Sequence, residues 1–332
     1  MDRVTMEDIA DEVGVSINTV SRALNDKPDV NDQTKREILQ KAEDLNYQPN
    51  RFAKGLRKSK TSTIGVIVAD ILNPFFAGVL KGVEKTARRE NYSIIVQDTS
   101  ENYENEMSAI QTMLGEQVDG LLITPVQTER DSIKHLQKSG LPFVLLGRFF
   151  EELETNYVVT DDVKGAYKVI EHLIGRGHEI ISMINGPSHI SSSKERFLGF
   201  KKSMKKHNLE VFDSLIFNDV FTMDQGYNTA KEIIKTSPKP TAVFCYSDFV
   251  ALGVLKATRD LGLTVPEDLA VVGYDDIFFS DSLDVPLTTV KIPKKELGMR
   301  SFKLLNELIN NGSSQTIEEI KLETKLKIRK SA

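Results

Sequence analysis

The chain of 332 residues, 40% hydrophobic and 27% charged, is long enough for two or three compact domains. Its net charge is −5, and residues 1–60 alone hold 11 Lys and Arg against 11 Asp and Glu, so bulk charge does not indicate a nucleic-acid binder. The apolar runs are far shorter than the ~20 residues of a membrane span, and no secretory signal is visible. The one cysteine, Cys245, excludes an internal disulfide or a multi-thiolate metal site. We therefore expect a cytoplasmic protein with no membrane partner.

Three short helices are predicted within residues 1–48. Thr5 and Asp8 have the spacing of a capping box at the start of the first helix, and Gly14 supplies the turn that follows it. Ser16 can cap a second helix, and a third is predicted after Asn31. Three short helices bury little apolar area, so this headpiece is expected to gain order from a partner.

The second helix has two different faces. Its apolar face contains Val20, Ala23 and Leu24, and its other face contains Ile17, Asn18, Ser21 and Arg22. Taken alone, residues 5–25 fit a helix-turn-helix and an ordinary helical hairpin equally well. In the second interpretation Arg22 is a surface cation paired with Asp26, one turn further on.

A basic stripe follows the headpiece. Ten residues contain five cations and no acid: Arg51, Lys54, Arg57, Lys58 and Lys60. Such a stripe can face phosphates, and its alternative is a solvated linker. Gly55 makes this segment a poor isolated helix.

From about Thr61, strand and helix patterns alternate. The apolar strand patterns are STIGVIV, SIIVQ, GLLIT, PFVLLG, IISMI, TAVFCY and LAVVGYDD. Continuous apolar strands between helices indicate parallel sheets covered on both faces, with ligands at the carboxyl ends of the strands. The region is too long for one small sheet, which indicates two α/β subdomains facing a cleft.

Enzyme motifs are absent from the sequence. It contains no G-x-x-x-x-G-K-[ST] loop, no dinucleotide fingerprint, no H-E-x-x-H and no G-x-S-x-G elbow. The histidines show no metal-ligand spacing: His135, His172, His178, His189 and His207. We expect no catalysis, no metal and no cofactor, with Cys245 in the core and His178 as a structural histidine in a helix-to-strand turn.

A series of motifs spans nearly the whole chain in a fixed order. They are VTMEDIADEVGVSINTVSRALN, LNYQPNRFAKGLR, IGVIVADILNPFF, VDGLLITP, GRGHEIISMINGP, RFLGF, YSDFVALGVLKA, VVGYDD and PLTTV. In this combination the chain resembles the lactose-repressor and galactose-repressor (LacI/GalR) family of bacterial transcription regulators. The resemblance implies an all-α helix-turn-helix headpiece, a hinge, and an α/β core of two doubly wound parallel-sheet subdomains, like the type I periplasmic sugar-binding proteins. A transporter's solute-binding protein shares the cleft, but the headpiece and the lack of a signal peptide count against it.

The resemblance also sets domain boundaries. The headpiece is expected at residues 1–48 and the hinge at 49–60. The N-subdomain is expected at 61–160 plus 291–320, and the C-subdomain at 161–290 plus 321–332. The last strand of the C-subdomain is expected in KLETKLKIR.

For DNA, the resemblance places base-reading residues in the first turns of the second helix. Arg22 suits a guanine, Asn18 an adenine or a phosphate, and Ile17 a thymine methyl group. Four hydroxyl residues are expected to cap helices or to hold phosphates: Thr5, Ser16, Thr19 and Ser21.

The hinge is expected to fold when two copies meet on DNA. Its expected contacts are Asn50, Arg51, Ala53 and Leu56. Leu56 matches the leucine that wedges into the minor groove and kinks the duplex, and its alternative is a core leucine under the headpiece.

For the effector, the resemblance points to the cleft. The expected contacts are Asn73, Phe75, Phe76, Arg148, Lys194, Arg196, Phe221, Ser247 and Asp275. A sugar has an apolar C–H face and a rim of hydroxyl groups, so aromatic rings beside amide, guanidinium and carboxylate groups suit it. One of the two adjacent phenylalanines is expected to be core at a helix start.

Three cleft positions depart from similar proteins. Lys194, Ser247 and Ile292 stand where those often have Arg, Asn and Gln. Ile292 offers no hydrogen bond, and a sugar hydroxyl buried there unpaired would cost about 1–3 kcal/mol. The effector is therefore expected to lack a polar group at that point or to be turned differently.

The mechanism that follows is a homodimer on a near-palindromic operator, in which effector binding closes the cleft and changes the spacing of the two hinges. No leucine heptad follows the last expected strand, so a dimer rather than a tetramer is expected. The effector is expected to be a small carbohydrate-like molecule. The alternative is a regulator whose DNA binding is enhanced by a purine, a sugar phosphate or a phosphocarrier protein.

Overall fold

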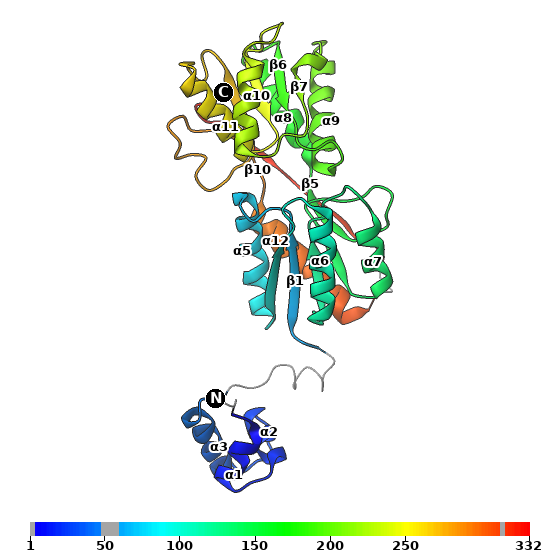
Figure 1. Ribbon diagram of the computed structural model, residues 1–332, viewed down its shortest axis with the longest axis vertical. Coiled ribbons are helices and arrows are strands. Elements are labelled where there is room, and N and C mark those ends of the chain that lie inside the picture. The colour runs from blue at the N-terminus through cyan, green and yellow to red at the C-terminus, as the bar shows by residue number, and fades with distance from the viewer. Residues whose placement is uncertain (1–3, 48–59, 313–315) are drawn as a thin grey trace. The chain divides into compact units, whose positions relative to one another are not determined.

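A computed structural model describes residues 4–47, 60–312 and 316–332 (Figure 1). The chain forms two compact units, residues 1–61 and 62–332. The hinge positions expected to contact DNA, Asn50, Arg51, Ala53 and Leu56, lie outside the described residues.

The headpiece consists of α1 (Met6–Val13), α2 (Ile17–Leu24) and α3 (Asp32–Asp44). The predicted capping box is present, because the Asp8 amide donates to Thr5 Oγ1 at 3.3 Å and the Thr5 amide donates to Asp8 Oδ2 at 2.7 Å. Gly14 ends α1 with a φ of +74°, a left-handed conformation that glycine adopts without strain. Ile9, Val20 and Ile38, one from each helix, are fully buried and form the centre of the small core.

The N-subdomain is built on a six-stranded parallel sheet with the strand order β11-β5-β4-β3-β1-β2. Its strands are β1 (Thr63–Val68), β2 (Ser93–Asp98), β3 (Gly120–Ile123), β4 (Phe143–Leu146), β5 (Tyr157–Thr160) and β11 (Glu319–Leu322). Its helices are α5 (Pro74–Arg89), α6 (Tyr103–Gly115), α7 (Asp131–Ser139) and α12 (Lys294–Asn311). Apolar side chains of α5 and α12 cover one face of the sheet, and those of α6 and α7 cover the other.

The C-subdomain repeats this plan with the strand order β12-β10-β9-β8-β6-β7. Its strands are β6 (Ile181–Ile184), β7 (Ile216–Phe217), β8 (Ala242–Cys245), β9 (Ala270–Asp275), β10 (Thr288–Lys291) and β12 (Lys325–Lys327), of which only β12 runs antiparallel to its neighbour. Its helices are α8 (Asp162–Gly175), α9 (Ser191–Lys206), α10 (Met223–Ile233) and α11 (Asp248–Asp260), and a 3₁₀ turn spans Asp213–Leu215. One face packs on α8 and α9 and the other on α10 and α11, so the predicted doubly wound sheets are confirmed.

The chain passes between the two sheets after β5, after β10 and after β11. These passages lie within one or two residues of the boundaries expected from the resemblance: Lys291 belongs to the C-subdomain sheet, and Lys321 and Leu322 to the N-subdomain sheet. The expectation of one final strand in KLETKLKIR was wrong. The segment divides between β11 and β12, since its first residues pair with β5 and its later residues pair with β10.

Candidate functional site

The outer face of α2 is open to solvent. Ile17 keeps 44% of its surface exposed, and Asn18 and Arg22 are exposed, whereas Val20 and Ala23 on the opposite face are buried. Ser16 caps the helix, because its Oγ accepts from the Thr19 amide at 3.1 Å and lies 2.8 Å from Thr19 Oγ1. The N-terminal turn of α2 therefore presents side chains of mixed chemistry on a helix whose other side is fixed by the core.

Arg22 forms an ion pair with Asp29, in the loop between α2 and α3. The alternative pairing with Asp26 is wrong, because Asp26 lies in the turn after the helix and pairs with Lys35 of α3 instead. Both members of the Arg22–Asp29 pair remain about half exposed, so the guanidinium can exchange Asp29 for another acceptor at small cost.

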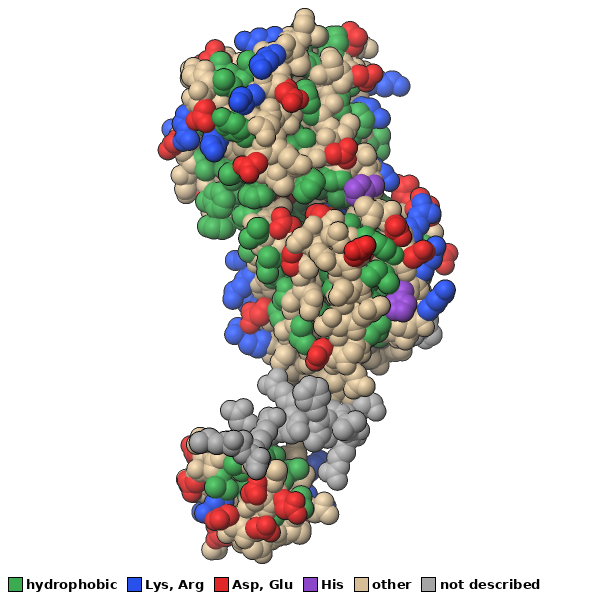
Figure 2. All heavy atoms as spheres, viewed as in Figure 1, with side chains coloured by type: hydrophobic (Ala, Val, Ile, Leu, Met, Phe, Trp, Pro, Cys, Tyr) green, Lys and Arg blue, Asp and Glu red, His purple; other side chains and the backbone are tan. Residues whose placement is uncertain are grey.

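A cleft lies between the two subdomains of the core. It is lined by Asp70, Asn73, Phe75, Phe76, Glu101, Thr124, Gly147, Arg148, Thr160, Asp162, Ser192, Arg196, Phe221, Tyr246, Ser247, Asp275, Ile292 and Leu297. Figure 2 shows Asp and Glu side chains gathered where the two subdomains meet on the viewed face. Most of the polar lining residues follow the carboxyl ends of parallel strands, where ligands of such sheets bind.

Arg148 is the cation of the N-subdomain wall. Its Nη1 and Nη2 donate to the two carboxylate oxygens of Glu101 at 2.9 and 2.5 Å, and Nη1 also donates to the Pro125 carbonyl at 2.9 Å. The side chain is only 7% exposed. A bidentate pair fixes the plane of both groups, so the remaining donors and lone pairs have defined directions.

Arg196 is the cation of the C-subdomain wall. Its Nε donates to Asp162 Oδ2 at 3.0 Å and its Nη1 to the Tyr246 carbonyl at 2.5 Å. The guanidinium lies over two aromatic rings, 3.8 Å from the centre of Tyr274 and 4.6 Å from that of Tyr246. Asp162 also accepts from the Thr160 hydroxyl at 2.6 Å and from the Tyr274 hydroxyl at 3.0 Å, so additional hydrogen bonds stabilise this buried ion pair.

Asp275 ends β9 and lines the same wall with 4% of its surface exposed. Burial raises the pKa of this carboxyl above its ordinary value, although Arg196 opposes the shift. A carboxyl group in this environment can donate or accept a hydrogen bond, depending on its protonation.

Two aromatic rings line the N-subdomain wall. Phe75 and Phe76 pack edge to face with their ring centres 5.0 Å apart. Phe76 is 5% exposed and belongs to the core, as expected for one of the two, while Phe75 is partly buried and packs against the cores of both subdomains. Asn73 precedes them as the cap of α5, with Oδ1 accepting from the Phe75 amide at 3.0 Å.

The three cleft positions at which this chain differs from similar proteins are Lys194, Ser247 and Ile292, and they differ in burial. Ile292 and Ser247 line the cleft, each 2% exposed, and Ser247 caps α11 by accepting from the Val250 amide at 3.2 Å. Lys194 is exposed on α9 and is not among these lining residues, so its effector contact stays a prediction. Helical periodicity accounts for this exposure: Ser192 and Arg196 face the cleft, and a residue two positions from each points to the other side of the helix.

The sequence-based prediction missed several polar lining residues: Asp70, Glu101, Thr124, Thr160, Asp162, Ser192 and Tyr246. Their signal was position, because Thr124 and Tyr246 directly follow β3 and β8, while Asp70, Glu101 and Asp162 follow their strands by two or three residues. Two further residues have the expected structural character: Cys245 is fully buried in β8, where burial raises its thiol pKa, and His178 Nδ1 lies 2.9 Å from Thr241 Oγ1. Among the described residues, no helix has the length and apolar character needed to cross a membrane.

A helix-turn-helix headpiece and a two-subdomain core with a polar cleft together define the class of DNA-binding regulators with a ligand-binding core. The comparisons with known proteins agree. Residues 5–50 match the family described as bacterial regulatory proteins, lacI family, and residues 61–330 match periplasmic binding proteins and the sugar binding domain of the LacI family. The chain belongs to the LacI family of bacterial transcription regulators.

Individual relatives cover nearly the whole chain. Catabolite control protein A of Priestia megaterium is 34% identical over 309 residues, 92% of this chain and 93% of that protein. The lac repressor dimer bound to operator and the anti-inducer ONPF has a TM-score of 0.89 at 25% identity, with 99% of each chain covered. A complex of the transcriptional regulator CelR with cellobiose has a TM-score of 0.77 at 28% identity, covering 99% of this chain and 100% of that one.

These matches confirm the expected fold class and general function. The chain is a DNA-binding transcriptional repressor of this family, with a core built for a small-molecule effector. The relatives are transcription regulators, and the alternative of a corepressor-type regulator is not favoured.

Proposed function

We propose that this repressor is a cytoplasmic homodimer that reads a near-palindromic operator and whose operator affinity is controlled by a neutral, carbohydrate-like effector in the cleft. The lac repressor neighbour is a dimer on its operator, which supports the same assembly here. Each headpiece then reads one half-site.

On the DNA side, Ile17, Asn18 and Arg22 are proposed to contact bases, because all three are exposed on α2. Thr5, Ser16, Thr19 and Ser21 are proposed to lie near phosphates in addition to the helix-capping roles of Thr5 and Ser16. The hinge contacts of Asn50, Arg51, Ala53 and Leu56 stay predictions.

On the effector side, the charge of the cleft carries the proposal. The lining contains four carboxyl groups, of Asp70, Glu101, Asp162 and Asp275, and two guanidinium groups. Both guanidinium groups are already paired, Arg148 with Glu101 and Arg196 with Asp162. A phosphate group brings about 1.5 to 2 further negative charges, and among the described lining residues no unpaired cation is present to meet them.

The same lining suits a neutral polyhydroxy ligand. Phe75, Phe76 and Phe221 offer apolar faces, and Asn73, Arg148, Arg196, Ser247 and Asp275 offer polar groups. Thr124 Oγ1 is buried in the cleft wall and has no hydrogen-bond partner in the described structure, so it adds a hydroxyl that a ligand can satisfy. Complexes of relatives with cellobiose and with ribose support the same ligand class.

A thermal-shift screen of the full chain with matched ligand pairs tests this proposal. The pairs are glucose with glucose 6-phosphate, ribose with ribose 5-phosphate, and cellobiose alone, with adenine and guanine as purines. We expect a neutral sugar to raise the melting temperature, because a ligand at about 100 times its Kd adds about 2.7 kcal/mol to the stability of the native state.

Asp275→Ala is the control variant, and its melting temperature should respond at least tenfold less sensitively to the sugar concentration. Stronger stabilisation by a phosphorylated member or by a purine would contradict the neutral-sugar proposal and would favour the corepressor alternative. An unchanged response of Asp275→Ala would place the effector elsewhere.

A further inference from the structure

The main chain at the end of β9 adopts an unusual conformation. Asp275 has a φ of +122° and Asp276 a φ of +55°, two successive non-glycine residues with positive φ. Such conformations are uncommon for L-residues and persist where the surroundings hold them in place. Asp275 is also a cleft residue, so the groups that hold this turn decide where its carboxyl group points.

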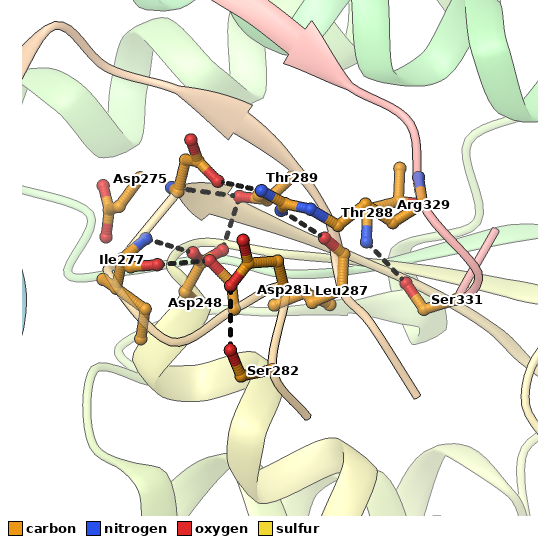
Figure 3. A network of polar contacts seen from close by, with 12 residues as sticks. Asp248, Asp275, Ile277, Asp281, Ser282, Leu287, Thr288, Thr289, Arg329 and Ser331 are labelled. Carbon is orange, nitrogen blue, oxygen red and sulfur yellow. Dashed lines mark hydrogen bonds and ion pairs between the residues drawn. The ribbon is translucent and has the colours of Figure 1, made fainter. Parts of the chain in front are cut away.

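The C-subdomain supplies part of the support. Asp248 Oδ2 accepts from the Ile277 amide at 2.9 Å, and its Oδ1 accepts from the Thr289 hydroxyl at 2.5 Å. Arg329 Nη2 lies 2.6 Å from Asp276 Oδ1. Figure 3 shows these groups around the end of the strand, with Asp248 between Ile277 and Thr289.

Lys294 supplies the remaining support. Its ammonium group donates to the main-chain carbonyl of Asp275 and, at 2.7 Å, to that of Asp276. Two carbonyls of successive residues converge on one ammonium group, and they belong to the two residues that have positive φ values. Lys294 thus contacts the main chain whose conformation is unusual, and its partners are neutral oxygens rather than a carboxylate.

Lys294 comes from the opposite subdomain. It is the first residue of α12, which packs on α5 and on the N-subdomain sheet. Its side chain runs across α5 at Gly78, where an added Cβ would lie 3.0 to 3.2 Å from Lys294 Cβ, Cδ and Cε. Four described side chains form hydrogen bonds with residues 275–277. Three of them belong to the C-subdomain: Asp248, Thr289 and Arg329. The fourth, Lys294, is the first residue of a helix of the N-subdomain.

We propose that Lys294 is a positioning residue for effector binding, which holds the Asp275 main chain from the opposite subdomain and so aims the Asp275 carboxyl group into the cleft. The proposal rests on the proposed function in one respect, that Asp275 contacts the effector. It also makes Lys294 a direct link between the cleft wall and the α12–α5 helix pair.

The first test needs no ligand. Amide hydrogen exchange of the full chain is compared for wild type, Lys294→Met, Lys294→Arg and Lys295→Met, the last being an exposed neighbour on the same helix. We expect the peptide covering residues 275–279 to exchange about tenfold or more faster in Lys294→Met, because a charge-assisted hydrogen bond is lost there. Lys294→Arg should restore protection at least in part, and Lys295→Met should match wild type.

A peptide from β3 serves as internal reference, since general destabilisation would speed exchange there as well. Wild-type protection of residues 275–279 in Lys294→Met, or equal acceleration in β3, would overturn the proposal.

The second test measures calorimetric binding of cellobiose and of D-ribose to the same variants and to Asp275→Asn. If one sugar binds, Lys294→Met should weaken its Kd about tenfold, with partial recovery in Lys294→Arg. A weakened Asp275→Asn beside an unaffected Lys294→Met would refute the role of Lys294 alone. Unaffected binding in both would refute the proposed site. If wild type binds neither sugar, the proposed sugar class loses support, and the exchange measurement still decides the role of Lys294.

Discussion

The headpiece and the cleft hold their arginines in contrasting ways. Arg22 lies on an exposed helix face and pairs with an exposed Asp29, whereas Arg196 is buried between two aromatic rings and pairs with a buried Asp162. Both belong to surfaces proposed to bind a ligand. The difference is that Arg22 contributes little to its own fold, while Arg196 is part of the structure that shapes the cleft.

This contrast teaches how each surface can change. A side chain on the face of α2 can be exchanged to read another operator while the three-helix core stays intact, because Ile9, Val20 and Ile38 make that core without it. A cleft side chain cannot be exchanged alone, because its partner is left buried and unpaired. Substitutions at the two sites should therefore separate stability from binding.

Arg196→Ala should have the largest effect. Asp162 would keep its hydroxyl partners Thr160 and Tyr274 but lose its cation in a buried site, which costs about 3–5 kcal/mol of unfolding free energy for such pairs. Urea unfolding of the full chain, followed by circular dichroism at pH 7, measures this loss in the transition of the core. Arg22→Ala is the matched control and should leave the free energy of unfolding within about 0.5 kcal/mol of wild type. Equal unfolding free energies of Arg196→Ala and Arg22→Ala would contradict the proposed difference between the buried and the exposed arginine.

Arg22→Ala should instead act on DNA binding. A guanine contact of this kind is worth about 1–3 kcal/mol of discrimination, so affinity for an operator selected from random sequence should fall about five- to 150-fold for each half-site. Fluorescence anisotropy with labelled duplexes measures this fall, and a scrambled duplex serves as the control because general phosphate binding should change much less. Selection of the same operator by the variant, with the same affinity, would contradict the assignment of Arg22 as a base-reading residue.

The elements of the fold were largely predictable because they depend on local patterns. The capping box at Thr5, the turn at Gly14 and the cap at Ser16 were predicted from spacing and are present. The alternating apolar strands predicted two parallel sheets, and both are present. The division of KLETKLKIR between two sheets was not predicted, because both parts have the same strand pattern and only tertiary pairing separates them.

The cleft was predictable in part. Asn73, Phe75, Arg148, Phe221 and Asp275 line it together, and they were predicted from the family resemblance. The partners that orient them were not predicted, because Glu101 lies 47 positions from Arg148 and Asp162 lies 34 positions from Arg196 in the sequence. The contacts of Lys294 were not predicted either, because its hydrogen-bond partners are the carbonyls of residues 18 and 19 positions away in the sequence.

Asp275→Asn should change how the free energy of unfolding depends on pH. Burial raises the pKa of Asp275 above 3.8, Asp248 and Asp162 act in the same direction, and Arg196 and Lys294 oppose it. The folded state therefore holds a proton that the unfolded chain has released. This contribution to stability is fully present below about pH 3.8 and is lost as the pH rises through the raised folded pKa.

The slope from this one group is at most about 1.4 kcal/mol per pH unit. Asparagine does not titrate, so the unfolding free energy of Asp275→Asn should rise relative to wild type as the pH increases from 5 to 8, as measured by urea unfolding at each pH. Arg22→Ala should run parallel to wild type over the same range, because its site is exposed. A constant difference between Asp275→Asn and wild type would mean that Asp275 is ionised in the folded protein throughout. In that case Asp275 would stay ionised although it is buried. The headpiece and the cleft would then differ in the burial of their charged groups, and this burial would not change the protonation of Asp275.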